Sequence, residues 1–190
     1  MRARSWWFLV LSVALAACRS TRPAGVETPV TALDRNATER SLMHIRATSG
    51  DHVESFRAQL LASPRAMLFN IYTPLGTSFA RIYATSDRVL FLNDFENTTW
   101  SGTPAEFAQA FGFFGDANPL AMADLILGRR TSFPGVNITY EPNTFPPKHV
   151  VVTQGARRLE IEHLESVYTT ASVEEPQVPR NYRCCVPPRL

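Results

Sequence analysis

The sequence predicts a mainly β domain of the α+β class, in which short helices cover part of an antiparallel sheet. Seven runs rich in Val, Ile, Phe, Tyr and Thr favour strands. Two segments carry the signals with which helices begin. Several strands are apolar on both faces, whereas an antiparallel sheet with one solvated face alternates apolar and polar side chains.

The strands are expected at residues 53–61, 66–73, 78–84, 88–93, 136–140, 149–153 and 159–168. Short segments typical of turns separate several neighbouring runs: Ser63-Pro64, Pro74-Leu75-Gly76, Thr85-Ser86-Asp87 and Gln154-Gly155. Successive antiparallel hairpins need such short connections. We therefore expect a meander rather than alternating β and α units.

Two helices are expected to interrupt the meander. The first begins at Thr103-Pro104-Ala105-Glu106, which combines an N-cap hydroxyl, a proline in the first turn and the glutamate of a capping box. The second runs from Asn118-Pro119 to Leu127, and Gly128 is placed to end it. Because apolar side chains surround most of its axis, the second helix should lie on an apolar surface.

Three expected strands are apolar on both faces: Met67-Leu68-Phe69, Val89-Leu90-Phe91-Leu92 and Val150-Val151-Val152. A curled sheet with an apolar inside, closed on its open side by the two helices, would cover them. A β-sandwich explains the same runs equally well. The residues alone leave both arrangements open.

The first residues have the order of features of a secretory signal peptide. Arg2 and Arg4 precede an apolar run from Trp6 to Leu15, and small residues follow at 16–17. The run is shorter than the ~20 apolar residues that span a bilayer. We therefore expect residues 1–17 to be removed during export.

The segment Leu15-Ala16-Ala17-Cys18 resembles a lipobox. This resemblance implies cleavage before Cys18, a diacylglycerol on its sulfur and a further acyl chain on its freed amine. Since each buried methylene contributes roughly 0.8 kcal/mol, three chains would anchor the protein stably to a membrane, facing the periplasm. An ordinary export signal followed by a chance cysteine is the alternative.

We divide the chain into a signal peptide (1–17), a flexible tether (18–40), one domain (41–172) and a proline-rich extended tail (173–190). The tether region is rich in Thr, Pro, Ala and Arg without apolar periodicity. The tail has several prolines and little that could be buried. Its adjacent cysteines, Cys184 and Cys185, are assigned no function.

Composition and motifs argue against nucleic acid binding and catalysis. Without Arg2 and Arg4, the mature chain has 19 − 2 = 17 basic residues against 17 acidic ones, so we expect no nucleic acid partner. No histidine has a metal-ligand spacing, and phosphate-loop and Gly-x-Ser-x-Gly motifs are missing from the sequence. We expect no enzymatic activity.

The densest titratable cluster is Glu160, Glu162, His163 and Glu165. On a strand, His163 takes the face opposite to Glu160 and Glu162, so the cluster does not converge. We interpret it as a solvated strand edge. A hydrolytic enzyme would return as a hypothesis only if His149 or His163 faced a serine and a carboxylate in one cleft.

Residues 70–78 (Asn-Ile-Tyr-Thr-Pro-Leu-Gly-Thr-Ser), followed by Phe79 and Arg81, are similar to the strand, Pro-Leu-Gly loop and return strand of LolB, the family of outer-membrane receptors for lipoproteins. Asn118-Pro119-Leu120 and Leu125-Ile126-Leu127-Gly128 resemble its helical segment, and residues 145–168 its closing strands. The resemblance covers most of 41–170. It implies an unclosed antiparallel β-barrel with two or three short helices covering an apolar cavity.

The resemblance also implies a function. The protein would take acylated lipoproteins from a periplasmic carrier of LolA type, bind their acyl chains and help insert them into the outer membrane. Leu75 would be the membrane-facing tip of its loop. No cofactor is expected beyond the diacylglycerol and N-acyl chain on Cys18. Cavity candidates are Phe69, Ile71, Phe79, Leu90, Leu92, Phe107, Phe111, Leu120 and Leu127.

Two alternatives remain open within the same fold. The protein could be a structural or accessory envelope lipoprotein, in which case the apolar side chains would form a solid core. It could also carry another lipid. A filled or hollow interior decides between the first alternative and a carrier, since a receptor needs room for an acyl chain.

Overall fold

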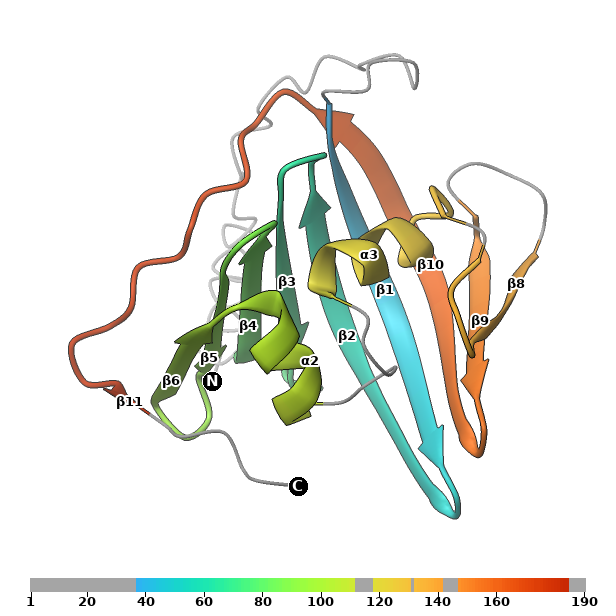
Figure 1. Ribbon diagram of the computed structural model, residues 1–190, viewed down its shortest axis with the longest axis horizontal. Coiled ribbons are helices and arrows are strands. Elements are labelled where there is room, and N and C mark those ends of the chain that lie inside the picture. The colour runs from blue at the N-terminus through green and yellow to red at the C-terminus, as the bar shows by residue number, and fades with distance from the viewer. Residues whose placement is uncertain (1–36, 112–117, 131, 142–146, 185–190) are drawn as a thin grey trace, which may run out of the picture.

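The computed structural model describes residues 37–111, 118–130, 132–141 and 147–184. These residues form one 10-stranded sheet in the order β11-β6-β5-β4-β3-β2-β1-β10-β9-β8, with two helices on one face (Figure 1). The strands are β1 (Thr38–Ser49), β2 (His52–Ala62), β3 (Ala66–Tyr72), β4 (Ser78–Thr85), β5 (Val89–Asn93), β6 (Thr98–Gly102), β8 (Asn137–Glu141), β9 (His149–Gln154), β10 (Arg157–Thr169) and β11 (Arg183–Cys184). The helices are α2 (Pro104–Phe111) and α3 (Pro119–Ile126).

The prediction of a mainly β chain with an unclosed sheet and two helices is confirmed for this part of the protein. The sheet ends in β11 on one side and β8 on the other. All strands belong to the one sheet, so the β-sandwich is not the arrangement that covers the doubly apolar strands. No helix in the described ranges is both long and apolar enough to cross a bilayer.

Strand β1 joins two meanders at the centre of the sheet. It runs antiparallel to β2 through a tight hairpin and antiparallel to β10 along its whole length. A register shift at Leu42/Met43 leaves Leu164 as an extra residue of β10. The strand begins at Thr38, three residues before the domain boundary expected at Ser41. The strands that the sequence predicts do not include β1, β6 or β11.

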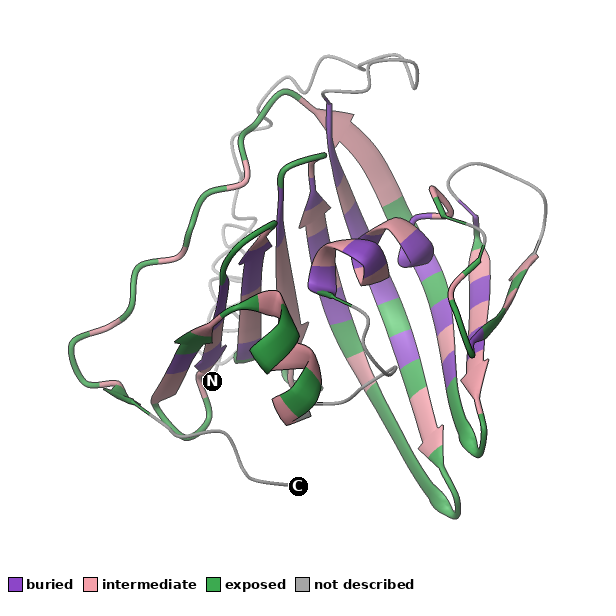
Figure 2. Cartoon of the chain, viewed as in Figure 1, coloured by how far each residue is buried: buried purple, intermediate pink, exposed green. Residues whose placement is uncertain are grey.

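Alternation along the strands assigns side chains to two faces. The helix face, which packs against α2 and α3, contains one core cluster that includes Met43, Ile45, Leu60, Met67, Val89, Val150, Val152, Ile161, Leu125 and Leu127. The opposite face contains a second cluster of Ala66, Tyr83, Leu90 and Leu92. Buried positions gather in the middle of the sheet and along α3, whereas α2 and the β1–β2 turn are more exposed (Figure 2).

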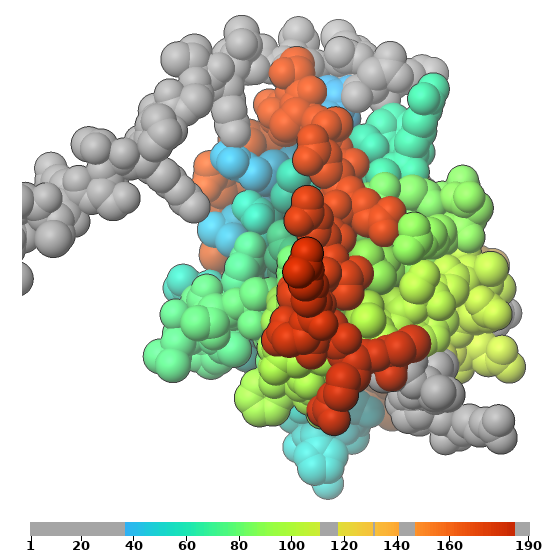
Figure 3. Space-filling model, turned by 90° about the vertical axis from the view of Figure 1, so that its left-hand side faces the viewer, coloured from blue at the N-terminus to red at the C-terminus, as the bar shows by residue number. Residues whose placement is uncertain are grey.

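The second face is covered by the segment that follows β10, which we call the strap (residues 170–184). It crosses the outer surface of the sheet, as Figure 3 shows, and ends in β11, which pairs in parallel with β6. Val173, Pro176, Pro179 and Tyr182 are half-buried and the residues between them are exposed. Since a polyproline II helix has three residues per turn, this spacing places all four on one side of the strap.

The strap explains why β3 and β5 are apolar on both faces. Val173 and Tyr182 pack against the cluster of Tyr83, Leu90 and Leu92. An ion pair between Arg88 and Glu175, with 3.1 Å between Nη1 and Oε1, adds a contact near the middle of the segment. The described part of the segment expected as a tail thus packs on the sheet through half-buried residues, from Val173 to Tyr182.

Gly128 ends α3 as the sequence predicts, and its geometry yields a test of the fold. Its φ is +71°, and a Cβ at this position would lie 2.9 Å from Cδ of Pro147. We expect Gly128→Ala to lower the free energy of unfolding by about 2 kcal/mol, measured by urea denaturation, since the left-handed backbone and the contact both cost energy.

Gly135 is the matched control, because its φ is +72° and a Cβ there would meet nothing within 4 Å. Gly135→Ala should carry only the backbone cost of about 1 kcal/mol. Equal losses in the two variants would show that the contact between Gly128 and Pro147 does not constrain the helix end.

Candidate functional site

The helix face is the first candidate site, and local capping positions both of its helices. At α2, the Thr103 backbone N–H donates to Glu106 Oε2 at 2.8 Å, and the Glu106 N–H donates to Thr103 Oγ1 at 3.3 Å. The hydrogen bonds that the Thr103 backbone N–H and the Thr103 hydroxyl donate to the Glu106 carboxylate hold its pKa below the usual value. At α3, Asn118 Oδ1 accepts the N–H of Ala121 at 2.8 Å. Both helix starts therefore have the caps that their sequences predict.

Several of the cavity candidates lie on the helix face. Phe69, Phe107 and Leu120 are half-buried against the core cluster, and Leu127 belongs to the cluster and is fully buried. Ile71 is half-buried and lies two residues after Phe69, on the same face of β3. Phe107 of α2 packs on Trp100 of β6, with 5.8 Å between ring centroids.

The structure does not bring the remaining candidates to this face. Leu90 and Leu92 are buried in the cluster beneath the strap, because in β5 the residues facing the helices are Val89 and Phe91. Phe79 is exposed at the start of β4. A site between sheet and helices therefore does not include Leu90, Leu92 or Phe79.

Two of the named positions lie outside what the structure describes. Cys18 belongs to residues 1–36, and the side chain of Phe111, the last residue of α2, is also outside the described set. Lipidation of Cys18 stays a prediction.

A buried polar chain connects β1, β10 and α3, and the sequence did not reveal it. Ser41 Oγ lies 2.6 Å from His163 Nδ1, and His163 Nε2 lies 3.2 Å from the carbonyl oxygen of Ile126. Because a carbonyl only accepts, Nε2 carries the proton and Nδ1 accepts from the Ser41 hydroxyl. Ser166 Oγ lies 2.9 Å from Ser41 Oγ and extends the chain.

This geometry corrects the interpretation of His163 as part of a solvated strand edge. Strand β10 is an inner strand between β1 and β9, and only 8% of His163 is exposed. Burial lowers the pKa of its imidazole, partly offset by the Ile126 carbonyl, so the ring is neutral. Although His163 contacts a serine, its other nitrogen meets a backbone carbonyl instead of a carboxylate. The condition stated for a hydrolytic site is not met at His163.

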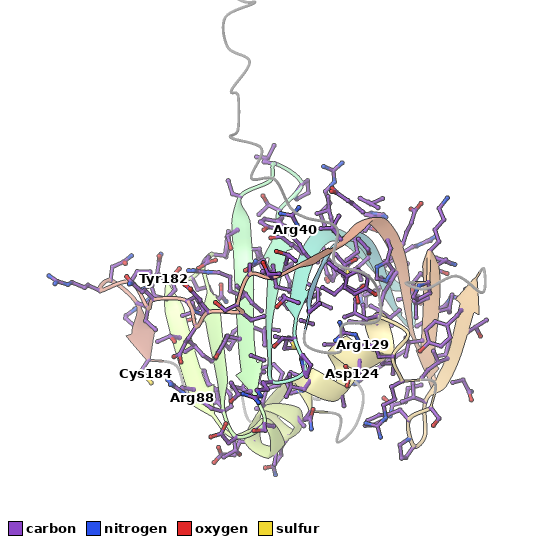
Figure 4. All side chains as sticks on the ribbon, turned by 90° about the horizontal axis from the view of Figure 1, so that it is seen from above. Arg40, Arg88, Asp124, Arg129, Tyr182 and Cys184 are labelled. Atoms are coloured by element: carbon purple, nitrogen blue, oxygen red, sulfur yellow. The ribbon has the colours of Figure 1, made fainter. Side chains whose placement is uncertain are left out.

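Further polar contacts hold the C-terminal end of α3. Arg129 Nη2 lies 3.1 Å from Oε2 of Glu39, which is fully buried on β1. Burial raises the pKa of the Glu39 carboxyl, and the Arg129 charge opposes this shift. The Tyr140 hydroxyl donates toward the carbonyls of Leu125 at 3.1 Å and Arg130 at 2.6 Å. Figure 4 shows Arg129 beside Asp124 on the inner side of the sheet, away from Tyr182 on the strap.

The second candidate site is the end of the sheet that carries Leu75. Its turn closes through hydrogen bonds from Thr73 N–H to the Thr77 carbonyl and from Gly76 N–H to the Thr73 carbonyl, both 2.9 Å. Gly76 has a φ of +81°, which glycine adopts at little cost. Leu75 is 92% exposed and does not fold back onto the sheet. Its contact with a membrane stays a prediction.

Asp94 organises the polar side of this end. Arg81 donates to it from Nη2 at 2.7 Å and from Nε at 3.0 Å, and the hydroxyls of Ser78 and Tyr182 also donate to it. Burial raises the pKa of the Asp94 carboxyl, but these hydrogen bonds prevail and hold it below its usual value. The strap is thereby tied to the turns around Leu75 and Phe95.

The lowered pKa of His163 predicts a pH dependence of stability. In the unfolded chain the imidazole has an ordinary pKa of about 6.5 and binds a proton below it, whereas the folded protein keeps the ring neutral to lower pH. The free energy of unfolding should therefore fall as the pH drops from about 7.5 through 6.5.

Replacing this ring isolates its contribution. In His163→Asn, measured by urea denaturation across the same range, this part of the pH dependence should vanish. His44→Asn removes an exposed histidine of the neighbouring strand and should behave as the wild type does. A His163→Asn variant with the wild-type slope would contradict the assignment of the neutral buried ring.

Comparison with known proteins finds similarity among solved structures. The sequence matches no protein-family model, and it matches no curated protein. Among solved structures, the chain is similar to the crystal structure of LolA superfamily protein NE2245 from Nitrosomonas europaea, with 9% identity and a TM-score of 0.47. The match covers 70% of this chain and 86% of that chain. At this identity it assigns neither an activity nor a partner to the protein.

Proposed function

We propose that the protein is a lipid-anchored periplasmic lipoprotein that binds acyl chains on its helix face. In this proposal it receives acylated lipoproteins from a carrier of LolA type and helps insert them into the outer membrane. Cys18 carries its diacylglycerol and N-acyl chain, and the protein performs no chemistry of its own. The lipobox and the Pro-Leu-Gly turn support the anchor and the membrane-facing loop.

The observation that carries the proposal is a set of half-buried apolar side chains where the two helices meet the sheet. Phe107 comes from α2, Leu120 and Met122 come from α3, and Phe69 and Phe91 come from the sheet. They surround the fully buried core without being covered completely. Burial of such surface by an acyl chain is favourable by roughly 25 cal/mol per Å², and a methionine adapts to chains of different shape.

A second function has its own supporting observation. Met43, Leu125 and Leu127 are fully buried between α3 and the sheet, so part of the helix face is ordinary packed core. This favours a structural or accessory envelope lipoprotein, whose apolar face serves only stability. A carrier of a lipid other than lipoprotein would share the acyl-binding face with the first proposal.

Displacement of a fluorescent fatty acid separates the carrier from the structural protein. We use a soluble form that begins at residue 18 with Cys18→Ser. This form should bind the probe. Phe107→Asp should weaken binding at least tenfold, because it removes the apolar area of the ring and also places a charge in an apolar site, which is unfavourable.

Val178→Asp is the control, because Val178 is exposed on the strap, at the other face of the sheet. Its affinity for the probe should be unchanged, and urea denaturation should show both variants folded. If the soluble wild type binds no fatty acid, the structural function replaces the carrier.

Leu75→Glu tests the transfer step. Because the side chain is 92% exposed, the free energy of unfolding should change by no more than about 0.5 kcal/mol. Acylated cargo should accumulate on the variant without entering vesicles, as measured by flotation of labelled lipoprotein.

Leu164→Glu serves for comparison, because Leu164 is half-exposed on β10 and lies away from the end of the sheet that carries the Pro-Leu-Gly turn. It should deliver cargo at the wild-type rate. Normal delivery by Leu75→Glu, or ready unfolding of that variant, would show that the turn has no transfer role.

A further inference from the structure

Two neighbouring turns place exposed apolar side chains at one end of the sheet. Leu75 lies in the β3–β4 turn and is 92% exposed, and Phe95 lies in the β5–β6 turn and is 73% exposed. Phe79, which starts β4 beside these turns, is 41% exposed. The rings of Phe79 and Phe95 stack with 5.8 Å between their centroids. The register of β3–β6 places the β3–β4 and β5–β6 turns at the same end of these strands.

A network of hydrogen bonds fixes the β5–β6 turn and keeps its apolar side chain exposed to water. The N–H groups of Asp94 and Phe95 donate to the Phe79 carbonyl at 2.9 and 3.3 Å, and Asn93 Oδ1 accepts the N–H groups of Phe95 and Glu96. Asp94 itself accepts from Arg81, Ser78 and the strap residue Tyr182. Because these hydrogen bonds fix the turn backbone, Phe95 stays exposed and does not fold back onto the core. An exposed aromatic side chain held in this way indicates an interaction surface.

The shape and charge of this end fit a lipid bilayer. Protruding aromatic and aliphatic tips insert into a fluid apolar layer without needing a complementary groove. Arg81 forms an ion pair with Asp94 at 2.7 Å, whereas Glu96 accepts a hydrogen bond from the neutral Asn93 amide at 3.1 Å and keeps its negative charge. Attraction to this end therefore rests on apolar burial and not on net positive charge.

The chain that precedes the domain allows the contact. Leu75 and Phe95 lie at the end of the sheet opposite to Thr38, the first residue of β1. Residues 19–37 separate Thr38 from the proposed anchor at Cys18 and reach about 60 Å when extended, whereas a strand of the length of β3 spans about 23 Å. This length is sufficient for the anchored domain to face its own membrane with this end.

We infer that Phe79 and Phe95 form, together with Leu75, a two-turn surface that inserts into the lipid bilayer. The inference rests on the proposed function, because it takes the protein to be anchored at a membrane. It extends the proposed membrane-facing loop of Leu75 by a second turn, β5–β6, and by the aromatic pair of Phe79 and Phe95. Tyr182 of the strap contributes by holding Asp94, which links the two turns.

Vesicle flotation tests the surface directly. The soluble form with Cys18→Ser is mixed with uncharged phosphatidylcholine vesicles, and the bound fraction is measured. The wild type should float, Phe95→Ser should reduce the partition coefficient at least tenfold, and 0.5 M NaCl should leave wild-type binding unchanged. Leu164→Ser, a half-exposed leucine on β10, is the matched control and should float as the wild type does.

Three results would overturn the inference. Phe95→Ser could float as the wild type does, binding could require anionic lipid and disappear in salt, or the wild type could fail to float. If the wild type does not float but Phe95→Ser blocks transfer from a loaded carrier protein, the surface binds a protein partner.

Fatty acid displacement, measured on the same proteins, distinguishes failure of this inference from failure of the proposed carrier function. Probe binding without flotation overturns only the bilayer contact, and flotation without probe binding overturns only the carrier function.

Discussion

The need to cover two apolar faces of one sheet determines most of this structure. A strand with Val, Leu, Phe and Leu in sequence exposes apolar area to water on whichever face stays bare, and that area is unfavourable by roughly 25 cal/mol per Å². Helix α3 covers one face with Leu125 and Leu127, and the strap covers the other with Val173 and Tyr182. The two covers differ in kind, since α3 carries its own backbone hydrogen bonds whereas the strap leaves most of its backbone to water.

Local signals predicted the elements that local chemistry determines. The capping residues Thr103 and Asn118 and the terminating Gly128 mark the helices within a residue or two of their observed ends. Strand β1 was missed because polar residues such as His44 and Arg46 interrupt its apolar positions, although Met43 and Ile45 alternate with them correctly. Alternation shows that a strand has two faces, but it does not show which face meets the helices. Leu90 and Leu92 were assigned to the wrong side of the sheet for this reason.

The candidate site was harder to predict than the fold because its polar parts are assembled from distant segments. Ser41 and His163 meet across the β1–β10 pair, and Glu39 meets Arg129 beyond α3. The strap was expected to be free because its composition is typical of unpacked chain, yet Val173, Pro176, Pro179 and Tyr182, its half-buried residues, recur at every third position. That period was visible in the sequence and indicates one-sided packing of an extended segment.

The pairing of β1 with β10 also determines when the protein is able to fold. Ser41 and His163 are 122 positions apart, and the central strand of the sheet lacks one of its neighbours until the chain is present as far as Thr169. Contacts between such distant segments must overcome a large loop-closure entropy, so sheets built on them form slowly. A chain that is synthesised from its N-terminus leaves one edge of β1 unpaired until residues 157–169 are present, so the backbone groups on that edge stay open to pairing with other strands until then.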